Sequence, residues 1–555
     1  MSGTRLLPVA VVAALLCGVA PRRAEAQYDA PPPPAAYALE NVTVVGADGS
    51  RTDSVNIVVR GGLIQAMAPG AAIPPDARVL EGDSLFVYPG LVDAEGTAEV
   101  EWPEARDGED DPPAWAPPRS RQGFLPHRRV ADYLVAVGDD LAQQRARGVV
   151  AALVHPSGGL APGQPAVLVH RASAGAPWEL VASESAGLTL AFQSASGVYP
   201  SQLFGVIAYL RQAFLDAERY EAVRAAYAAD PRGMIAPGWD PDHEALQAAA
   251  RREAPVFFRA DGAEDIRRAF DLQDQFGFGM VVVGGDEAWK VAGELVSRQV
   301  PVLVSLDFPS PSDWDPDADT VPGELKPDQV REKERFENLW SNAGRLERAG
   351  VTFALTSGGG TGDLLEGARK AVEFGLSPEG AVAALTTAPA ALLGLTEMTR
   401  VEPGMAATFV VTDGELLGED TKVTYAFLEG ALEEASGGGS GGSGEAPAAN
   451  LGGEWAVDLD AAGQAMEVTL TLEQSEDGSL TGRMTGGDMP PTDVEGSISG
   501  SSVTLRLQAE GLPEPIVLTG SVSEDGTSIT GSGSTPFGEV NFTATKRPGF
   551  LGGSR

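Results

Sequence analysis

Residues Phe86 to Thr97 read FVYPGLVDAEGT, and this stretch decides the fold. An apolar run, Phe86 to Val92, leads into three polar side chains at alternating positions, Asp93, Glu95 and Thr97. Alternate residues of a strand point to the same face, so the spacing predicts that these side chains lie together where a strand ends. Polar groups gathered at a strand end are typical of a functional site.

Three motifs in order resemble the amidohydrolase superfamily, and its imidazolonepropionase-like members in particular. Residues 89–97 resemble the family's P-G-(L/F)-(V/I)-D-x-H-x-H, residues 388–395 (APAALLGL) resemble N-P-A-x-x-L-G-L, and residues 401–407 (VEPGMAA) resemble I-E-x-G-K-x-A-D. The resemblance implies a TIM-like (β/α)8 barrel flanked by a composite β-sandwich. It also implies hydrolysis of non-peptide or dipeptide carbon–nitrogen bonds, with zinc or another divalent metal as cofactor.

The positions at which the family has metal ligands carry other residues in this chain. Two histidines of the first strand, one of the fifth, one of the sixth and the aspartate of the eighth align with Glu95, Thr97, Arg259, Gly284 and Ser357. A guanidinium keeps its proton at any useful pH and is no ligand. A carboxylate and a hydroxyl also form a poorer pair for a zinc-like ion than two imidazoles. We therefore predict no metal, no other cofactor and no assigned catalytic residue.

Two interpretations follow from these substitutions. In the first, the chain is a pseudoenzyme that acts in binding or scaffolding. In the second, it is an active hydrolase with a harder cation held by carboxylates, namely Asp93, Glu95, Asp261 and Asp286. His155, which follows an apolar run, completes the possible pocket.

Arg259 leads to a prediction that separates the two interpretations. Because the ends of the first and fifth barrel strands share one face, we expect Arg259 within salt-bridge reach of Asp93 or Glu95. The guanidinium would then occupy the space of the missing cation, and it could also hold a small ligand that carries a carboxylate.

The sequence predicts an α/β architecture with an additional all-β part. Short β-branched runs at both ends of the first module predict the composite β-sandwich, and strands alternating with helical stretches between them predict the barrel. About eight short strands near the C-terminus predict a small barrel or sandwich. The expected segments are a signal peptide (1–26), the sandwich (37–88 and 400–434), the βα barrel (89–399), a Gly/Ser linker (435–449) and the C-terminal β domain (450–547). A surface-binding role for the last domain is a third interpretation.

Composition limits the partners. The formal net charge of -38 argues against nucleic acid, which requires basic patches. Arg5, the apolar run after it and Ala24-Glu25-Ala26 indicate a secretory signal, so we expect an exported protein, periplasmic or extracellular. The only cysteine, Cys17, lies inside that signal, and no later segment is long and apolar enough to span a membrane. A small-molecule ligand remains possible, and the oligomeric state is open.

Overall fold

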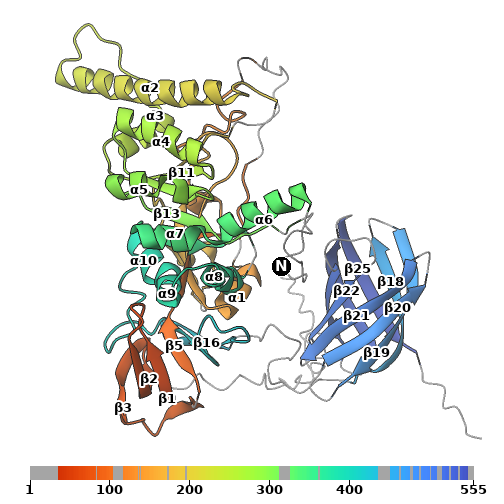
Figure 1. The fold of residues 1–555 in the computed structure, drawn as a ribbon. Helices are drawn as coiled ribbons and strands as arrows, with labels where there is room; N and C mark the ends of the chain where they lie inside the picture. Colours follow the sequence, from red (N-terminus) through yellow and green to blue (C-terminus); the bar gives the residue numbers. More distant parts are fainter. Residues whose placement is uncertain are drawn as a thin grey trace, which may run out of the picture.

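Figure 1 shows the computed structural model of the chain. It describes residues 36–434 and 450–547, apart from gaps at 83, 104–114, 116, 136, 138, 172–173, 194–196, 310, 312–325, 361–362, 462–463, 476–478, 487–488, 500–501, 509–515, 524–526 and 536–537. The predicted signal peptide (1–26) and linker (435–449) lie outside the described residues.

Strands from both ends of the first module share one sheet. Its order is β17 (Ala431–Glu434), β16 (Val423–Leu428), β15 (Phe409–Thr412), β5 (Phe86–Pro89), β1 (Ala36–Val45), β2 (Arg51–Arg60) and β3 (Leu63–Pro69), with β4 (Ala77–Glu81) paired to β1. The predicted pairing of residues 407–412 with the N-terminal sheet is confirmed, since β15 runs antiparallel to β5 from Phe409↔Pro89 to Thr412↔Phe86. The strands assigned to a sandwich thus form one hydrogen-bonded sheet.

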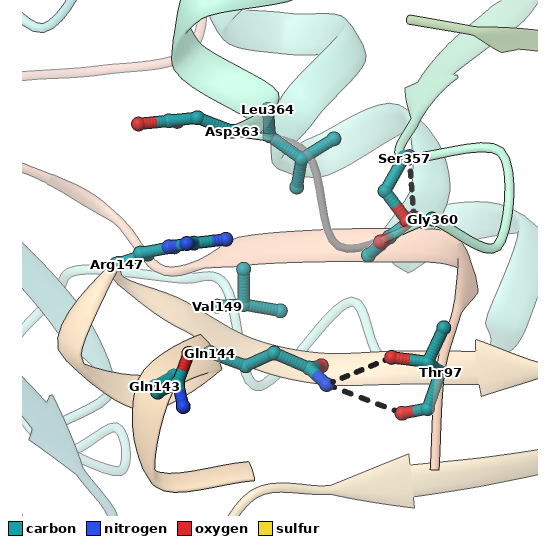
Figure 2. Close-up of a pocket in the computed structure, with 10 residues that line it drawn as sticks. Thr97, Gln143, Gln144, Arg147, Val149, Ser357, Gly360, Asp363 and Leu364 are labelled. Atoms are coloured by element: carbon teal, nitrogen blue, oxygen red, sulfur yellow. Dashed lines mark hydrogen bonds between the residues drawn. The ribbon is translucent and has the colours of Figure 1, made fainter. Parts of the chain in front are cut away.

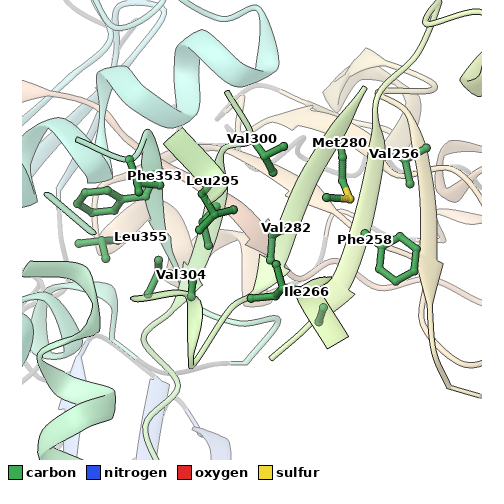
Figure 3. Packing of buried hydrophobic residues seen from close by; sticks show 14 of the residues in the cluster. Val256, Phe258, Ile266, Met280, Val282, Leu295, Val300, Val304, Phe353 and Leu355 are labelled. Atoms are coloured by element: carbon green, nitrogen blue, oxygen red, sulfur yellow. The ribbon is translucent and has the colours of Figure 1, made fainter. Parts of the chain in front are cut away.

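A parallel sheet of five strands forms the centre of the α/β part. Its order is β10 (Leu188–Ala191), β11 (Val256–Ala260), β12 (Met280–Gly284), β13 (Val302–Ser305) and β14 (Phe353–Thr356). Figure 3 shows Val256, Phe258 and Val282 of these strands packed with Ile266 and Leu295 of the covering helices. Their near-continuous apolar sequences are typical of parallel strands buried on both faces.

A second sheet is formed by strands that precede the parallel sheet in the sequence, and it corrects one expectation. It contains β6 (Leu91–Gly96), β7 (Val149–Val154), β8 (Ala166–Val169) and β9 (Val181–Ser183). β6 and β7 are parallel, as barrel strands would be, but β8 runs antiparallel to β7. The sequence also predicts a barrel strand at residues 167–170, and this prediction is wrong, since β8 is antiparallel to its neighbour. β10, which the sequence did not predict, is the next strand of the parallel sheet.

The helices follow or precede these strands, and several have clear end signals. They are α1 (Asp139–Ala146), α2 (Leu203–Ala229), α3 (Pro241–Ala250), α4 (Ala263–Phe276), α5 (Ala292–Arg298), α6 (Pro327–Trp340), α7 (Asn342–Ala349), α8 (Leu364–Glu373), α9 (Pro378–Leu385) and α10 (Thr387–Leu393), with short 3-10 turns η1 (Val130–Tyr133), η2 (Pro177–Leu180) and η3 (Ala288–Val291). Asp240 and Ser377 cap the N-termini of α3 and α9 with their side chains. Gly277 ends α4 in the left-handed conformation at φ 75°. In the described part of the chain, no helix combines the length and the apolar character needed to cross a bilayer.

The C-terminal part is a closed antiparallel barrel in which each strand pairs with its neighbours in sequence (Figure 1). Its strands are β18 (Gly453–Ala461), β19 (Gln464–Gln474), β20 (Ser479–Gly486), β21 (Met489–Ser499), β22 (Ser502–Gln508), β23 (Ile516–Val522), β24 (Ser528–Thr535) and β25 (Gly538–Lys546). Trp455 is fully buried in its core and donates its indole N–H to the carbonyl of Leu451 at 2.8 Å. Of the two forms that the sequence allows, barrel or sandwich, the structure has the barrel.

Candidate functional site

The ends of β6 and β14 are joined through Asp93 and Ser357. Asp93 is buried (4% exposed), and its Oδ1 accepts hydrogen bonds from the backbone N–H groups of Glu95 (3.0 Å) and Ser357 (3.1 Å). The Ser357 hydroxyl donates to the Glu95 carbonyl at 3.0 Å. Burial raises the pKa of the Asp93 carboxyl, and the hydrogen bonds from Ser357 and Glu95 counteract that rise. Asp93 and Ser357, two residues that the sequence predicts at the site, are thus hydrogen-bond partners of each other.

Glu95 and Arg259 form an ion pair near the carboxyl ends of β6 and β11. Arg259 Nη1 lies 2.6 Å from Glu95 Oε1, and the Glu95 side chain is 3% exposed against 34% for Arg259. Burial raises the pKa of the Glu95 carboxyl, while Arg259 opposes the rise. The other oxygen, Oε2, accepts a longer hydrogen bond of 3.4 Å from the Thr356 hydroxyl. The contact expected between Arg259 and a first-strand carboxylate is therefore confirmed.

Gly284 is covered by Asp261, which follows the neighbouring strand. A β-carbon on Gly284 would lie 2.0 Å from Asp261 Oδ1, closer than real β-carbons approach any atom, and the glycine has φ +92°. The turn that follows is fixed by hydrogen bonds from Gly285 N–H to the Ala260 carbonyl and from Glu287 N–H to the Asp261 carbonyl. Any larger residue at position 284, a histidine included, requires Asp261 to move.

Thr97 faces a small cavity of about 40 Å³ rather than a cation-binding cluster. Figure 2 shows the Gln144 side-chain amide directed at Thr97, donating to its hydroxyl at 3.3 Å and to its carbonyl at 3.2 Å. Ser357 lines the same cavity. The Thr97 hydroxyl therefore binds Gln144 and helps to hold α1 against the end of β6.

His155 follows β7 and lines the larger cavity. Its Nε2 lies 3.2 Å from the Ala94 carbonyl and its Nδ1 lies 3.3 Å from the Thr189 hydroxyl. The ring packs edge-on against Phe257 with centroids 5.1 Å apart. Burial, with Arg259 adding to it, lowers the pKa of His155 to about 3, so the ring is neutral at physiological pH.

The larger cavity is about 400 Å³ and opens where the strands end. Its lining includes Glu95, Thr97, His155 and Arg259, together with the Gln193 amide, Trp102 and several small or apolar residues. This size lies within the range of small-molecule sites. The cavity therefore combines an ion pair, a neutral imidazole and an apolar wall.

The four carboxylates of the hard-metal interpretation do not come together as one donor set. Asp93 and Glu95 are neighbours in β6, and Asp261 and Asp286 influence each other at the ends of β11 and β12. Partial desolvation, followed by Asp261, raises the pKa of Asp286 to about 6. Among the described residues, no group of three or more His, Cys, Asp or Glu side chains is placed to hold a metal ion. These residues do not fit the family's metal.

Sequence reasoning missed three residues that shape the site. Thr356 contacts Glu95, Gln144 holds Thr97, and Gln193 lines the larger cavity. Thr356 could have been found, because it lies directly before Ser357 on an apolar strand. Gln144 and Gln193 lie far from any motif, and nothing in their local sequence points to the site.

Comparison with known proteins identifies the fold. No protein-family model matches the sequence, and no curated protein matches it. A solved amidohydrolase from Thermotoga maritima is similar, with a TM-score of 0.57 and 22% identity over 71% of this chain and 99% of that chain. A Xaa-Pro dipeptidase with bound methionine (TM-score 0.44, 15% identity, 72% of this chain and 100% of that chain) and a molinate hydrolase (0.42, 13%, 73% and 96%) are similar at lower TM-scores. The first likeness shows that this chain has the amidohydrolase fold.

Proposed function

We propose that this chain is a member of the amidohydrolase superfamily that has lost the family's metal site and acts in binding or scaffolding. The observation that carries the proposal is the 2.6 Å ion pair between Arg259 and Glu95. It joins two positions at which the resemblance expects metal ligands, on the first and fifth strands. A permanent cation therefore lies where the metal's ligand would be.

We infer further that β6 and β7 of the second sheet and the five strands of the parallel sheet are arcs of one TIM-like barrel. At one edge, β14 meets β6 through the Ser357 N–H on Asp93 and through the Gly359 N–H on the Glu95 carbonyl (2.7 Å). At the other edge, the Thr189 N–H donates to the Gly163 carbonyl (2.9 Å), which links β10 to the segment before β8. One buried cluster also joins both sheets, since Ala94, Leu153 and Val167 pack with Phe257, Val281, Val283, Leu303 and Ala354.

Two of the oxygen atoms that a cation would need already have partners. Glu95 Oε1 is bound by Arg259, and Asp93 Oδ1 accepts two backbone N–H groups. A divalent ion would have to displace the guanidinium or bind beside it, and like charges a few ångströms apart in a partly dry site repel strongly. The hard-metal interpretation with Asp93, Glu95, Asp261 and Asp286 consequently has less support.

The ligand proposed for the larger cavity is a small molecule that carries a carboxylate. Arg259 keeps about a third of its side chain exposed. A guanidinium can bind two carboxylates at once because it has donors on more than one edge. The Gln193 amide, which lines the same cavity, offers a further hydrogen bond to the rest of the ligand.

Export and the remaining segments are part of the same proposal. We infer a periplasmic or extracellular protein with the boundaries given above: signal (1–26), composite β domain (37–88 and 400–434), barrel (89–399), linker (435–449) and C-terminal β domain (450–547). The strongly acidic composition favours solubility and disfavours nucleic acid as a partner. The C-terminal barrel is either a partner-binding module or a structural appendage.

Metal content tests the proposal. The purified mature chain, dialysed mildly, is expected to hold no stoichiometric metal and to hydrolyse neither dipeptides nor cyclic amides when zinc, manganese or magnesium is added. A cooperative thermal unfolding transition of the same sample serves as the control for correct folding. One tightly held metal per chain, or metal-dependent hydrolysis that disappears in Glu95→Ala, would establish the carboxylate site instead.

A further inference from the structure

Helix α2 has one buried face and one exposed face up to Ala217, and no residue of the helix after Ala217 is buried. It spans 27 residues, Leu203–Ala229, and is the outermost labelled helix of the α/β part in Figure 1. Its buried side, which includes Leu210, Phe214 and Ala217, faces the core and α3, and Gln247 of α3 donates to the Ala217 carbonyl at 3.0 Å. The opposite side is open to solvent in the described part of the chain.

The exposed side carries a regular seam. Its positions alternate in spacing between four and three residues, the spacing by which two helices pack side by side. Every one of them is exposed: Phe204, Ala208, Arg211, Leu215, Glu218, Ala222, Ala225 and Ala229. Six of the eight are apolar, and the small alanines allow another helix to approach closely.

Large exposed apolar side chains also gather around this helix. Phe204 is 79% exposed and Leu215 44%, and the loop after the helix carries Ile235 at 92% and Trp239 at 76%. Seven of the fourteen large apolar side chains exposed in the described part fall within residues 199–239. Such concentration marks an interaction surface rather than scattered surface residues.

We propose that this seam pairs with α2 of a second copy of the chain, in the antiparallel orientation. Charge selects both the partner and the direction. With Leu215 near the two-fold axis, Arg211 of each copy comes beside Glu218 of the other, which gives two equivalent ion pairs. A parallel pairing would place Arg211 against Arg211 and Glu218 against Glu218. In the described part of the chain, neither residue forms an ion pair within its own copy.

Two further observations fit a second copy as the occupant. α2 carries three arginines and three acidic residues, whereas the whole chain has 78 acidic against 40 basic residues, so the pairing face avoids the repulsion between two acidic molecules. In antiparallel packing, the N-terminal end of one α2, which carries Phe204, lies beside the C-terminal end of the partner's α2. The loop with the exposed Ile235 and Trp239 begins just after that C-terminal end. The inference is independent of the proposed function.

Sedimentation velocity of the full mature chain over a wide concentration range tests the pairing. A dimer is expected, and Leu215→Arg should weaken it at least tenfold while the far-UV circular dichroism spectrum stays unchanged, because Leu215 is exposed. Val296→Arg on α5, a position of similar exposure (42%), is the matched control and should leave the dimer intact. A monomer at every concentration, or a dimer indifferent to Leu215→Arg, would overturn the proposal.

Charge reversal tests the orientation. Arg211→Glu and Glu218→Arg should each weaken the dimer, and the double variant should restore it, because the two pairs re-form with exchanged signs. Leu215→Cys near the two-fold axis should give a disulfide-linked dimer on mild oxidation, whereas Val296→Cys should not. Failure of the double variant to recover, together with no cross-link at position 215, would contradict the antiparallel pairing.

Discussion

Arg259 and Glu95 depend on each other because the Glu95 carboxylate is almost fully buried and Arg259 is its ion-pair partner. A buried carboxylate without a counter-ion is costly, and removal of one member of such a pair destabilises a protein more than replacement of both. In the proposed function, the guanidinium of Arg259 stands where the resemblance expects an imidazole ligand. The pair therefore joins β6 to β11, and the effect of losing it can be measured.

We expect Arg259→Met to lower the free energy of unfolding by about 3 kcal/mol at pH 8, the lower end for a broken buried pair, because Arg259 is partly exposed. Burial already raises the pKa of Glu95. Without Arg259, the ionised Glu95 carboxylate destabilises the folded state most at high pH and least at low pH, where the carboxyl is protonated. The loss should therefore shrink at pH 5. Urea denaturation at both pH values measures it, and Arg259→Met with Glu95→Gln should recover most of it. A loss that is equal at both pH values would argue against an uncompensated Glu95.

His170 leads to a prediction of the opposite sign. Its side chain is fully buried, its Nδ1 lies 3.0 Å from the Val149 carbonyl, and its Nε2 has no hydrogen-bond partner in the described part of the chain. Burial lowers the pKa of His170 to about 4 from 6.5, so the unfolded state binds the proton first and stability falls as the pH drops through this window. His170→Leu should remove about 2 kcal/mol of the loss between pH 7 and pH 4.5. If the free energy of unfolding falls by the same amount between pH 7 and pH 4.5 in both proteins, this role of His170 is ruled out.

At the scale of elements, the sequence predicted best what its apolar patterns and end signals state directly. The pairing of residues 407–412 with the N-terminal strands and the eight C-terminal strands were readable from short β-branched runs between turns. The run from Phe86 to Val92 is not one strand, because β5 ends at Pro89 and β6, which contains Asp93, belongs to another sheet. The direction of β8 was not readable, because an apolar run of four residues looks the same in a parallel and an antiparallel strand.

The Asp261–Gly284 contact shows a second limit of sequence reasoning. The resemblance places Gly284 where the family has a histidine, and it gives no reason for a glycine there. The structure gives the glycine its own role, since Asp261 from the neighbouring strand occupies the space above it. Contacts between residues of different strands depend on register and side-chain direction, which no single stretch of sequence contains.

The end of β12 should therefore resist substitution. Gly284→Ala places a β-carbon 2.0 Å from Asp261 Oδ1 at φ +92°, so we expect a loss of at least about 2 kcal/mol in unfolding free energy. Gly279→Ala, just before the same strand, has no atom within 4 Å of its β-carbon and is the control.

Arg259→His combined with Gly284→His should fail to bind zinc, as judged by elemental analysis. A zinc-loaded double variant would show that the site needs only its imidazoles back.

On the scale of the whole molecule, the hydrophobic cores divide the chain. The buried cluster around Trp455 contains only residues from 451 to 544, and the other buried clusters contain none of them. A domain with its own core can fold alone. An eight-stranded barrel of this size also closes its sheet edges on itself, which removes the need for a neighbour to cover them.

We therefore expect residues 450–547 to unfold as a unit of their own. Trp455 is the only tryptophan beyond residue 340, so its fluorescence reports on this barrel alone in the isolated fragment. The fragment should unfold cooperatively in urea, and its midpoint should match one of two transitions of the full chain, because no shared core couples them. Trp455→Phe in the full chain should remove that transition from the fluorescence signal and leave the other unchanged. A single transition common to the whole chain, or a fragment that fails to fold, would mean that the barrel depends on the α/β part for its stability.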